Sequence, residues 1–343
     1  MNHLVNQSAA ACRSLFQALD PHAFSLPRPS RLCHTLIQIV AGIALASSFS
    51  AHASGVIALQ HDRQLSEVIG HRIAGSKEER DASNYIETVL KNNAYSVARQ
   101  TVRWTRNDVG TQRPTGYRTD NLIAEKKGLS TKVIVVGAHY DSMPMGVGAD
   151  DNASSVSVLL EVAQAIRDMQ MPYTVRFVFF TAEEQGEFGS MGYVSNLLAP
   201  ERANIIGMIN LDSLIAGDKR YVHAGTTGKN WLRDQILAVS KRLGAQFTTN
   251  PGLNPRYPYG TTGDWSDHAA FDSVGIPIAA LESTNWEIGD LDGYTQTALW
   301  GSFWHTPNDN LTTITKRFPG RIEAHFDAYT NVLIQTLLEL SPH

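Results

Sequence analysis

The chain has 343 residues, of which 43% are apolar and 18% are charged, with 29 Lys and Arg against 33 Asp and Glu. This composition is typical of a globular protein with a sizeable core and excludes an intrinsically disordered chain. Nucleic-acid-binding proteins usually carry an excess of basic residues, which this chain lacks, so we expect no nucleic-acid partner.

The amino-terminal segment has the features of a secretory signal peptide. Two arginines precede the apolar run Leu36–Ala46, which is followed by small residues that end in Ala-His-Ala at Ala53. Such a pattern predicts a signal peptide at residues 1–53, cleaved after Ala53, with a short buried helix as the alternative. The run is shorter than the roughly 20 apolar residues that span a membrane. We therefore expect one domain at residues 54–343 that is periplasmic or secreted and not inserted in a membrane.

Periodicity along this domain predicts alternating helices and strands. Apolar positions at helical spacing predict helices over residues 76–93, 156–166, 191–198, 229–243, 267–273 and 317–340. Short apolar runs predict strands over residues 95–104, 121–124, 132–138, 174–182, 205–211 and 277–281. The segment 248–263 is rich in Pro, Gly, Asn and Thr and predicts a long loop. This alternation predicts an α/β fold with a central mixed, mostly parallel β-sheet and helices on both faces.

Acidic and imidazole side chains directly follow three of the predicted strands. His139 and Asp141 follow the strand that ends at residue 138, Glu183 and Glu184 follow the next, and Asp212 follows the third. Ligands of open α/β sheets bind beyond the carboxyl ends of the strands, so we expect these side chains to meet at one edge of the sheet.

Four carboxylates would meet at this edge: Asp151, Glu183, Glu184 and Asp212. Like charges at such spacing repel and raise one another's pKa, so the cluster needs cations, and two zinc ions would balance it. Both cysteines, Cys12 and Cys33, precede the predicted cleavage site, so only oxygen and imidazole ligands remain. Such ligands suit a catalytic zinc site better than a structural one. Taken alone, Asp151 would be interpreted as a helix N-cap.

Five motifs carry a resemblance to a known family, namely AHYDS, GADDNAS, TAEEQGEFGS, NLDS and WHTPNDN. In content and order they resemble those of the bacterial co-catalytic di-zinc aminopeptidases, over residues 75–340. Residues 248–297 also resemble a periplasmic member that trims N-terminal arginine. The resemblance implies a zinc exopeptidase fold and a metallo-aminopeptidase, which the predicted signal peptide would export. No gap between the motifs is large enough for an inserted dimerisation domain, so we expect a monomer. It further implies two Zn²⁺ per chain and substrates that are the N-termini of peptides or proteins.

The resemblance also implies a role for each matching residue. One zinc would be held by His139 and Asp212, the other by Glu184 and His305, and Asp151 would bridge the two. A cis peptide bond is expected after Asp151.

Three further residues would assist the chemistry. Glu183 would be the general base that takes a proton from the water between the zinc ions and passes it to the leaving amine. Asp141 would orient His139 through its other ring nitrogen. Trp304 stands where some relatives carry a tyrosine that binds the oxyanion, so its indole N–H is a candidate donor, with packing in the pocket wall as the alternative.

The remaining polar residues receive simpler interpretations. Asp267 and His268 are interpreted as structural residues or supports of the ligands. The histidines without a motif partner are interpreted as surface or core residues: His61, His71, His223 and His325. An acidic group near Trp286 is interpreted as a solvated loop, with recognition of a basic side chain as the alternative: Glu282, Glu287, Asp290 and Asp292.

Two other classes of function share this fold. A glutaminyl cyclase is an acyltransferase that uses one zinc and also has a Trp before its last zinc ligand, but the motifs around Asp151 and Glu183 resemble the peptidases more closely. A binding module that has lost the site is disfavoured, because every expected ligand position and Glu183 are intact.

Overall fold

A computed structural model of the chain describes residues 55–107 and 114–341. The predicted signal peptide lies outside these residues. Within them, none of the helices is both long enough and apolar enough to cross a membrane.

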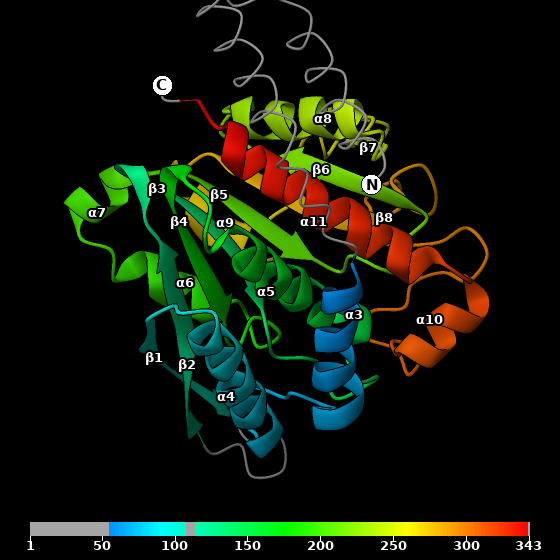
Figure 1. Cartoon of the computed structure of the whole chain (residues 1–343). Coiled ribbons are helices and arrows are strands. Elements are labelled where there is room, and N and C mark those ends of the chain that lie inside the picture. Colours follow the sequence, from blue (N-terminus) through cyan, green and yellow to red (C-terminus); the bar gives the residue numbers. More distant parts are fainter. Residues whose placement is uncertain (1–54, 108–113, 342–343) are drawn as a thin grey trace, which may run out of the picture. The chain divides into compact units, whose positions relative to one another are not determined.

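The described residues are built around one mixed β-sheet of eight strands in the order β1-β2-β4-β3-β5-β8-β6-β7 (Figure 1). The strands are β1 (Val97–Asn107), β2 (Pro114–Lys126), β3 (Gly128–His139), β4 (Met171–Phe180), β5 (Ile205–Asp212), β6 (Lys219–Ala224), β7 (Phe247–Thr248) and β8 (Ile278–Thr284). The central strands β4, β3, β5 and β8 run parallel, and β7 is parallel to β6. The pairs β1–β2, β2–β4 and β6–β8 are antiparallel. This confirms the predicted mixed sheet.

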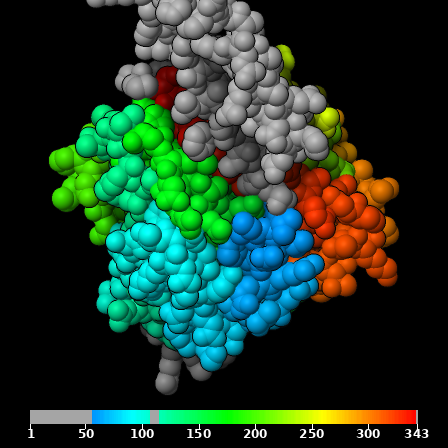
Figure 2. Space-filling model, in the orientation of Figure 1, coloured from blue at the N-terminus to red at the C-terminus, as the bar shows by residue number. Residues whose placement is uncertain are grey.

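Helices cover both faces of the sheet. One face carries α3 (Val56–Asp62), its wider-turned continuation η1 (Arg63–Ile69), α4 (Lys77–Asn92), α5 (Ser155–Ile166), α8 (Trp231–Leu243) and α11 (Arg321–Glu339). The other face carries α6 (Phe188–Ser195) and α9 (His268–Asp272), and α7 (Ala199–Asn204) leads into β5. The space-filling view shows α3 and η1 seated between α4 and the carboxyl-terminal helices (Figure 2).

The central strand β3 shows why the sheet needs both layers. Ile134 and Val136 belong to the apolar core under α5 and α11, while Val133 and Val135 belong to the core on the opposite face. Successive strand side chains point to opposite faces, so a continuously apolar run is stable only where both faces are covered.

Several boundaries differ from the sequence-based expectation. The strand expected at 121–124 is part of the longer strand β2. The first half of β2 is mostly polar, so it contains no apolar run that would indicate a strand. The helix expected at 317–340 is α11, which begins four residues later because the left-handed Gly320, with a φ of 80°, directly precedes it. Arg317 instead ends a separate short helix that was not expected, α10 (Leu311–Arg317). The helix expected at 191–198 begins and ends three residues earlier, and α3, η1 and β6 were not predicted.

Candidate metal centre

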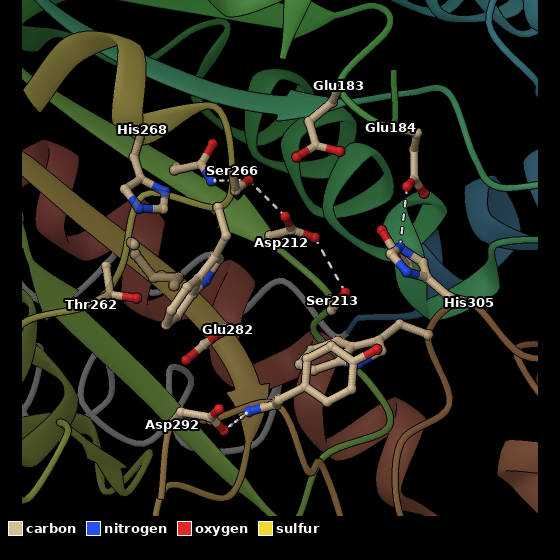
Figure 3. A pocket seen from close by; sticks show the side chains of 18 of the residues that line it. Glu183, Glu184, Asp212, Ser213, Thr262, Ser266, His268, Glu282, Asp292 and His305 are labelled. Carbon is tan, nitrogen blue, oxygen red and sulfur yellow. Dashed lines mark hydrogen bonds and ion pairs between the residues drawn. The ribbon is translucent and has the colours of Figure 1, made fainter. Parts of the chain in front are cut away.

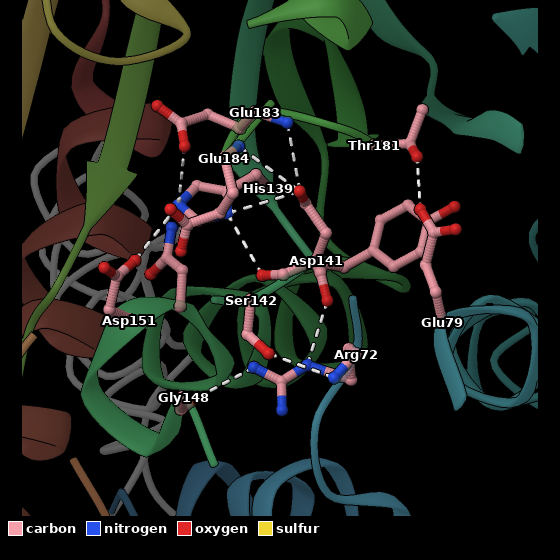
Figure 4. A network of polar contacts seen from close by, with 12 residues as sticks. Arg72, Glu79, His139, Asp141, Ser142, Gly148, Asp151, Thr181, Glu183 and Glu184 are labelled. Atoms are coloured by element: carbon pink, nitrogen blue, oxygen red, sulfur yellow. Dashed lines mark hydrogen bonds and ion pairs between the residues drawn. The ribbon is translucent and has the colours of Figure 1, made fainter. Parts of the chain in front are cut away.

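The expected site residues meet at the carboxyl edge of the central strands. β4, β3 and β5 are parallel neighbours, so the residues that follow each of them emerge at the same edge. The irregular turn η2 (Ala149–Ser154) brings Asp151 to this edge, and the segment before α10 brings His305 (Figures 3 and 4).

Two groups of potential ligands share the carboxylate of Asp151. Nε2 of His139 lies 3.3 Å from Asp151 Oδ1 and 3.6 Å from Asp212 Oδ1. Nε2 of His305 lies 3.2 Å from Asp151 Oδ2 and 3.1 Å from Glu184 Oε2. The two oxygens of Asp151 therefore face two different histidines. The peptide bond between Asp151 and Asn152 is cis, as expected.

The cluster carries more negative charge than its surroundings balance. Burial raises the pKa of Glu184 to about 7, and the neighbouring Asp151 carboxylate adds to this shift. Burial also raises the pKa of Glu183 well above its usual value. Hydrogen bonds to Asp151 and Glu184 raise the pKa of His305 to about 11. These shifts have one cause, which is that the buried carboxylates lack the positive charge that their ionised forms need.

The residues present fit divalent cations. In each group one ligand atom per residue lies within 4.8 Å of the others, and all the donors are carboxylate oxygens or imidazole nitrogens. Oε1 of Glu184 is buried and has no hydrogen-bond partner among the described residues. Cations in this site would balance the carboxylates and satisfy such an oxygen, because metal ions bind deprotonated carboxylates and neutral imidazoles.

Asp141 connects two of the segments that carry candidate ligands. Its Oδ1 lies 3.5 Å from Nδ1 of His139, which is also 3.2 Å from the Asp141 carbonyl oxygen. The same carboxylate accepts hydrogen bonds from the backbone N–H of Glu183 at 3.1 Å and of Glu184 at 3.2 Å (Figure 4). The first contact is the one expected from the resemblance. The second was not expected, and it aligns the turn after β4.

Further polar partners surround Asp212. Ser266 Oγ donates to Asp212 Oδ2 at 2.7 Å, and Asn210 Nδ2 donates to Ser266 Oγ at 2.9 Å. Asp267 and His268 are buried nearby but belong to neither group of ligands, which agrees with a structural or supporting role. Sequence reasoning missed Ser266 and Asn210 because a lone Ser or Asn carries no spacing signal.

Arg72 is a second feature that sequence reasoning missed. Its fully buried guanidinium donates hydrogen bonds to the carbonyl oxygens of Tyr140 at 2.9 Å, Val147 at 2.9 Å and Gly148 at 2.7 Å. It also reaches the carbonyls of Leu65 and Gly70. These bonds join the loop after β3 to the loop that leads to Asp151 (Figure 4).

A cavity of about 280 Å³ opens beside the candidate ligands. Aromatic residues form much of its wall: Tyr257, Trp265, Tyr294 and Trp304. The indole N–H of Trp304 is buried and has no hydrogen-bond partner in the described part of the chain. Trp304 thus lines the cavity together with the candidate ligand His305, a position that suits the proposed interaction with an oxyanion as well as packing.

Two carboxylates line the cavity on the side away from Glu183 and Glu184 (Figure 3). Glu282 belongs to β8 and is 9% exposed, so its interpretation as part of a solvated loop is wrong. Its Oε1 accepts hydrogen bonds from His223 Nε2 at 2.9 Å and Trp286 Nε1 at 2.6 Å. Asp292 lines the same side of the cavity.

The other members of these groups lie elsewhere. Glu287 and Asp290 are exposed, as a solvated loop implies. His71 is exposed, while the other three unassigned histidines are buried: His61, His223 and His325.

Comparison with known proteins gives a family match over residues 121–330, to peptidase family M28. The alkaline phosphatase isozyme conversion protein of Escherichia coli (strain K12) is 34% identical over 244 residues, which are 64% of this chain and 70% of that protein. Aminopeptidase YwaD of Bacillus subtilis (strain 168) is 30% identical over 209 residues, which are 59% of this chain but 42% of that protein.

Solved structures share the fold. A zinc aminopeptidase from Bacillus subtilis superposes with a TM-score of 0.66 at 19% identity, over 83% of this chain and 96% of that chain. A glutaminyl cyclase of Porphyromonas gingivalis gives 0.65 at 21% identity, over 84% and 99%. At such identities the likeness concerns the fold. The family match and the first relative are more specific, and together with the ligand geometry they establish that this chain belongs to peptidase family M28.

Proposed function

We propose that the protein is an exported metallo-aminopeptidase that removes single residues from the free N-termini of peptides or proteins. The observation that carries this proposal is the position of Asp151 between His139 and His305, with Glu183 beside them at one end of a cavity. Two similar proteins support the assignment to the aminopeptidases, since the relative YwaD and the structural neighbour from Bacillus subtilis are both aminopeptidases.

The chain offers ligands for two Zn²⁺. His139 and Asp212 would hold one ion, Glu184 and His305 the other, and Asp151 would contribute one oxygen to each. When bound, such ions supply a Lewis acid that polarises a carbonyl group and makes water acidic near neutral pH.

Glu183 is the proposed general base. Its Oε2 lies 3.8 Å from His139 Nε2, at the edge of the ligand cluster and facing the cavity. There this oxygen takes the proton of the attacking water and later delivers it to the leaving amine. The free indole N–H of Trp304 is the proposed donor to the oxyanion that forms on the substrate carbonyl.

The carboxylates of the site also explain why a free N-terminus would be required. An unblocked ammonium group is attracted to this electronegative end of the cavity, which sets the register of cleavage. Glu282 and Asp292 face the space that the first side chain of the substrate would enter. We therefore propose a preference for a basic first residue.

Aminoacyl p-nitroanilides test the proposal. The purified protein is expected to cleave them, to leave their N-acetylated versions intact, and to lose activity with a chelator. Glu183→Gln is the matched blank, because the amide keeps the shape of the side chain but accepts no proton. Equal cleavage of blocked substrates would indicate an endopeptidase, and full activity in Glu183→Gln would show that the assigned base is wrong.

A glutaminyl cyclase is the second candidate, favoured by the shared fold and by the Trp that precedes His305. It would bind one zinc per chain and release ammonia from N-terminal glutamine. Metal analysis of the purified protein separates the two, since two zinc ions per chain are expected here.

Processing and assembly are tested separately. Edman sequencing of protein recovered from the periplasm or medium is expected to begin at Ser54, which would leave residues 54–343 as the catalytic domain. Sedimentation is expected to show a monomer.

A further inference from the structure

The segment that carries His305 is tied to the turn that carries Asp151 by a carboxylate that is not a ligand. Asp309 is 1% exposed. Its Oδ1 accepts a hydrogen bond from the backbone N–H of Asp150 at 2.6 Å, and its Oδ2 accepts one from Asp151 at 3.2 Å. Its carbonyl oxygen accepts a further bond from Val147 N–H at 3.0 Å.

The backbones of these two segments lie very close together. A Cβ atom at Gly146 would come within 2.3 Å of the Thr306 carbonyl oxygen and 3.0 Å of Asp309 Cβ. Asp309 therefore does not reach across a gap. It links segments that are already in contact, four residues after His305 on one side and at Asp151 on the other.

Gln296 adds a second link between the same segments. Its Nε2 donates to Asp150 Oδ2 at 2.5 Å, and its Oε1 accepts from the N–H of Phe303 at 2.6 Å and of Trp304 at 3.3 Å. The chain just before His305 is thus attached to Asp150, and the chain just after it is attached to Asp150 and Asp151.

The opposite side of Asp151 is held by other residues. Asn152 Nδ2 donates to the Leu211 carbonyl at 3.1 Å, and Asn152 Oδ1 accepts from Ser213 N–H at 3.2 Å. These bonds attach Asp151 to the end of β5, where Asp212 lies. Loss of Asp309 would therefore loosen the pairing of Asp151 with His305 and leave its pairing with His139 and Asp212 in place.

We propose that Asp309 is a positioning residue that holds Asp151 Oδ2 opposite His305 Nε2, so that these two residues and Glu184 can share one cation. The inference rests on the proposed function only in that this cation would serve peptide hydrolysis. A carboxylate is needed, since it offers an acceptor oxygen to each of two consecutive N–H groups. An amide would turn an NH₂ donor toward one of them.

The test compares three variants by Co²⁺ titration of the metal-free protein, followed by visible absorption and by equilibrium dialysis. Asp309→Asn removes one acceptor and keeps the shape of the side chain. Asp168→Asn is the matched control, because this side chain is 83% exposed and precedes β4, at the edge of the sheet opposite the candidate ligands. His305→Ala shows the titration expected when one of the two cation sites is lost.

The wild type and Asp168→Asn are expected to bind two Co²⁺ per chain. Asp309→Asn is expected to bind one with unchanged affinity and the other about 10- to 100-fold more weakly, as in other proteins that lose a partner of a ligand. Its weak phase is expected to coincide with the phase that His305→Ala lacks. When Co²⁺ saturates both sites of Asp309→Asn, its kcat is expected to recover to the wild-type value, and its KM is expected to equal that of the wild type at every metal concentration.

Two results would overturn the proposal. One is an Asp309→Asn variant whose two Co²⁺ affinities are both within threefold of the wild type. The other is an equal weakening of both sites together with a lower unfolding temperature of the metal-free protein, which would indicate general structural damage. If Asp309→Asn does not fold, Gln296→Met decides, since the same selective weakening is expected there and its absence contradicts the proposal. A wild type that binds two Co²⁺ but cleaves no aminoacyl substrate would refute the proposed function and leave this inference intact.

Discussion

Replacement of Glu282 by Gln tests the proposed preference for a basic first residue. The substitution removes one negative charge from the cavity and keeps the shape of the side chain. Its amide oxygen can still accept the hydrogen bonds that His223 and Trp286 donate to Oε1, so the wall of the cavity is expected to stay in place.

The size of the effect follows from the burial of Glu282. With 9% of the residue exposed, its carboxylate is poorly screened by water, so its interaction with a guanidinium is that of a charged hydrogen bond in a dry site. Such a bond contributes about 1.5–3 kcal/mol, which corresponds to a loss of roughly 10- to 150-fold in kcat/KM. Asp292 remains and would keep part of the preference.

The assay compares arginyl and leucyl p-nitroanilides. Glu282→Gln is expected to lower kcat/KM for the arginyl substrate by the factor given above and to change the leucyl value by less than about threefold. The control is Glu287→Gln, a member of the same acidic group that is exposed and paired with Lys219 at 2.6 Å. An equal loss for both substrates, or no loss for either, would refute the assignment of Glu282 to specificity.

Three other variants test the base, the buried arginine and a core histidine. Glu183→Gln is expected to lower kcat about 10²- to 10⁴-fold while the zinc content of the protein stays unchanged, and zinc loss would contradict its role as a base outside the ligand set. Arg72→Met is expected to lower the free energy of unfolding by about 3–5 kcal/mol in urea titrations, because it removes a fully buried cation that donates hydrogen bonds to five backbone carbonyl groups and attracts the carboxylates of Asp62 and Asp309. A loss below about 1 kcal/mol would contradict this. Burial lowers the pKa of His325 to about 3, so its contribution to stability is complete above pH 6.5 and decreases as the pH falls toward the folded pKa. Between pH 7 and pH 5 the wild type is therefore expected to lose about 2 kcal/mol relative to His325→Gln, and parallel pH profiles would contradict this.

Local patterns in the chain were enough to predict the buried strands and the residues that follow them. The apolar run of β3 and its neighbours, each with His or carboxylates directly after it, predicted which side chains meet, because parallel strands end at one edge. The motifs around Asp151 and His305 completed the candidate ligand set. Periodicity and motif spacing are properties of short segments, so they can be recognised without knowledge of the fold.

The supports of the site depend on contacts between distant segments. Asp309 and Asp151 are 158 positions apart, and Arg72 and Gly148 are 76 apart, so no local pattern links them. The sequence favours a loop at Glu282, because this charged residue directly follows a short apolar run. In the folded protein Glu282 is buried instead, because His223 and Trp286 donate hydrogen bonds to its carboxylate. A buried polar group is stable only where partners surround it, and the fold decides which partners those are. The α/β sheet and the candidate ligands at its edge thus followed from the sequence alone, whereas the cavity and the network that holds these side chains in place required the tertiary structure.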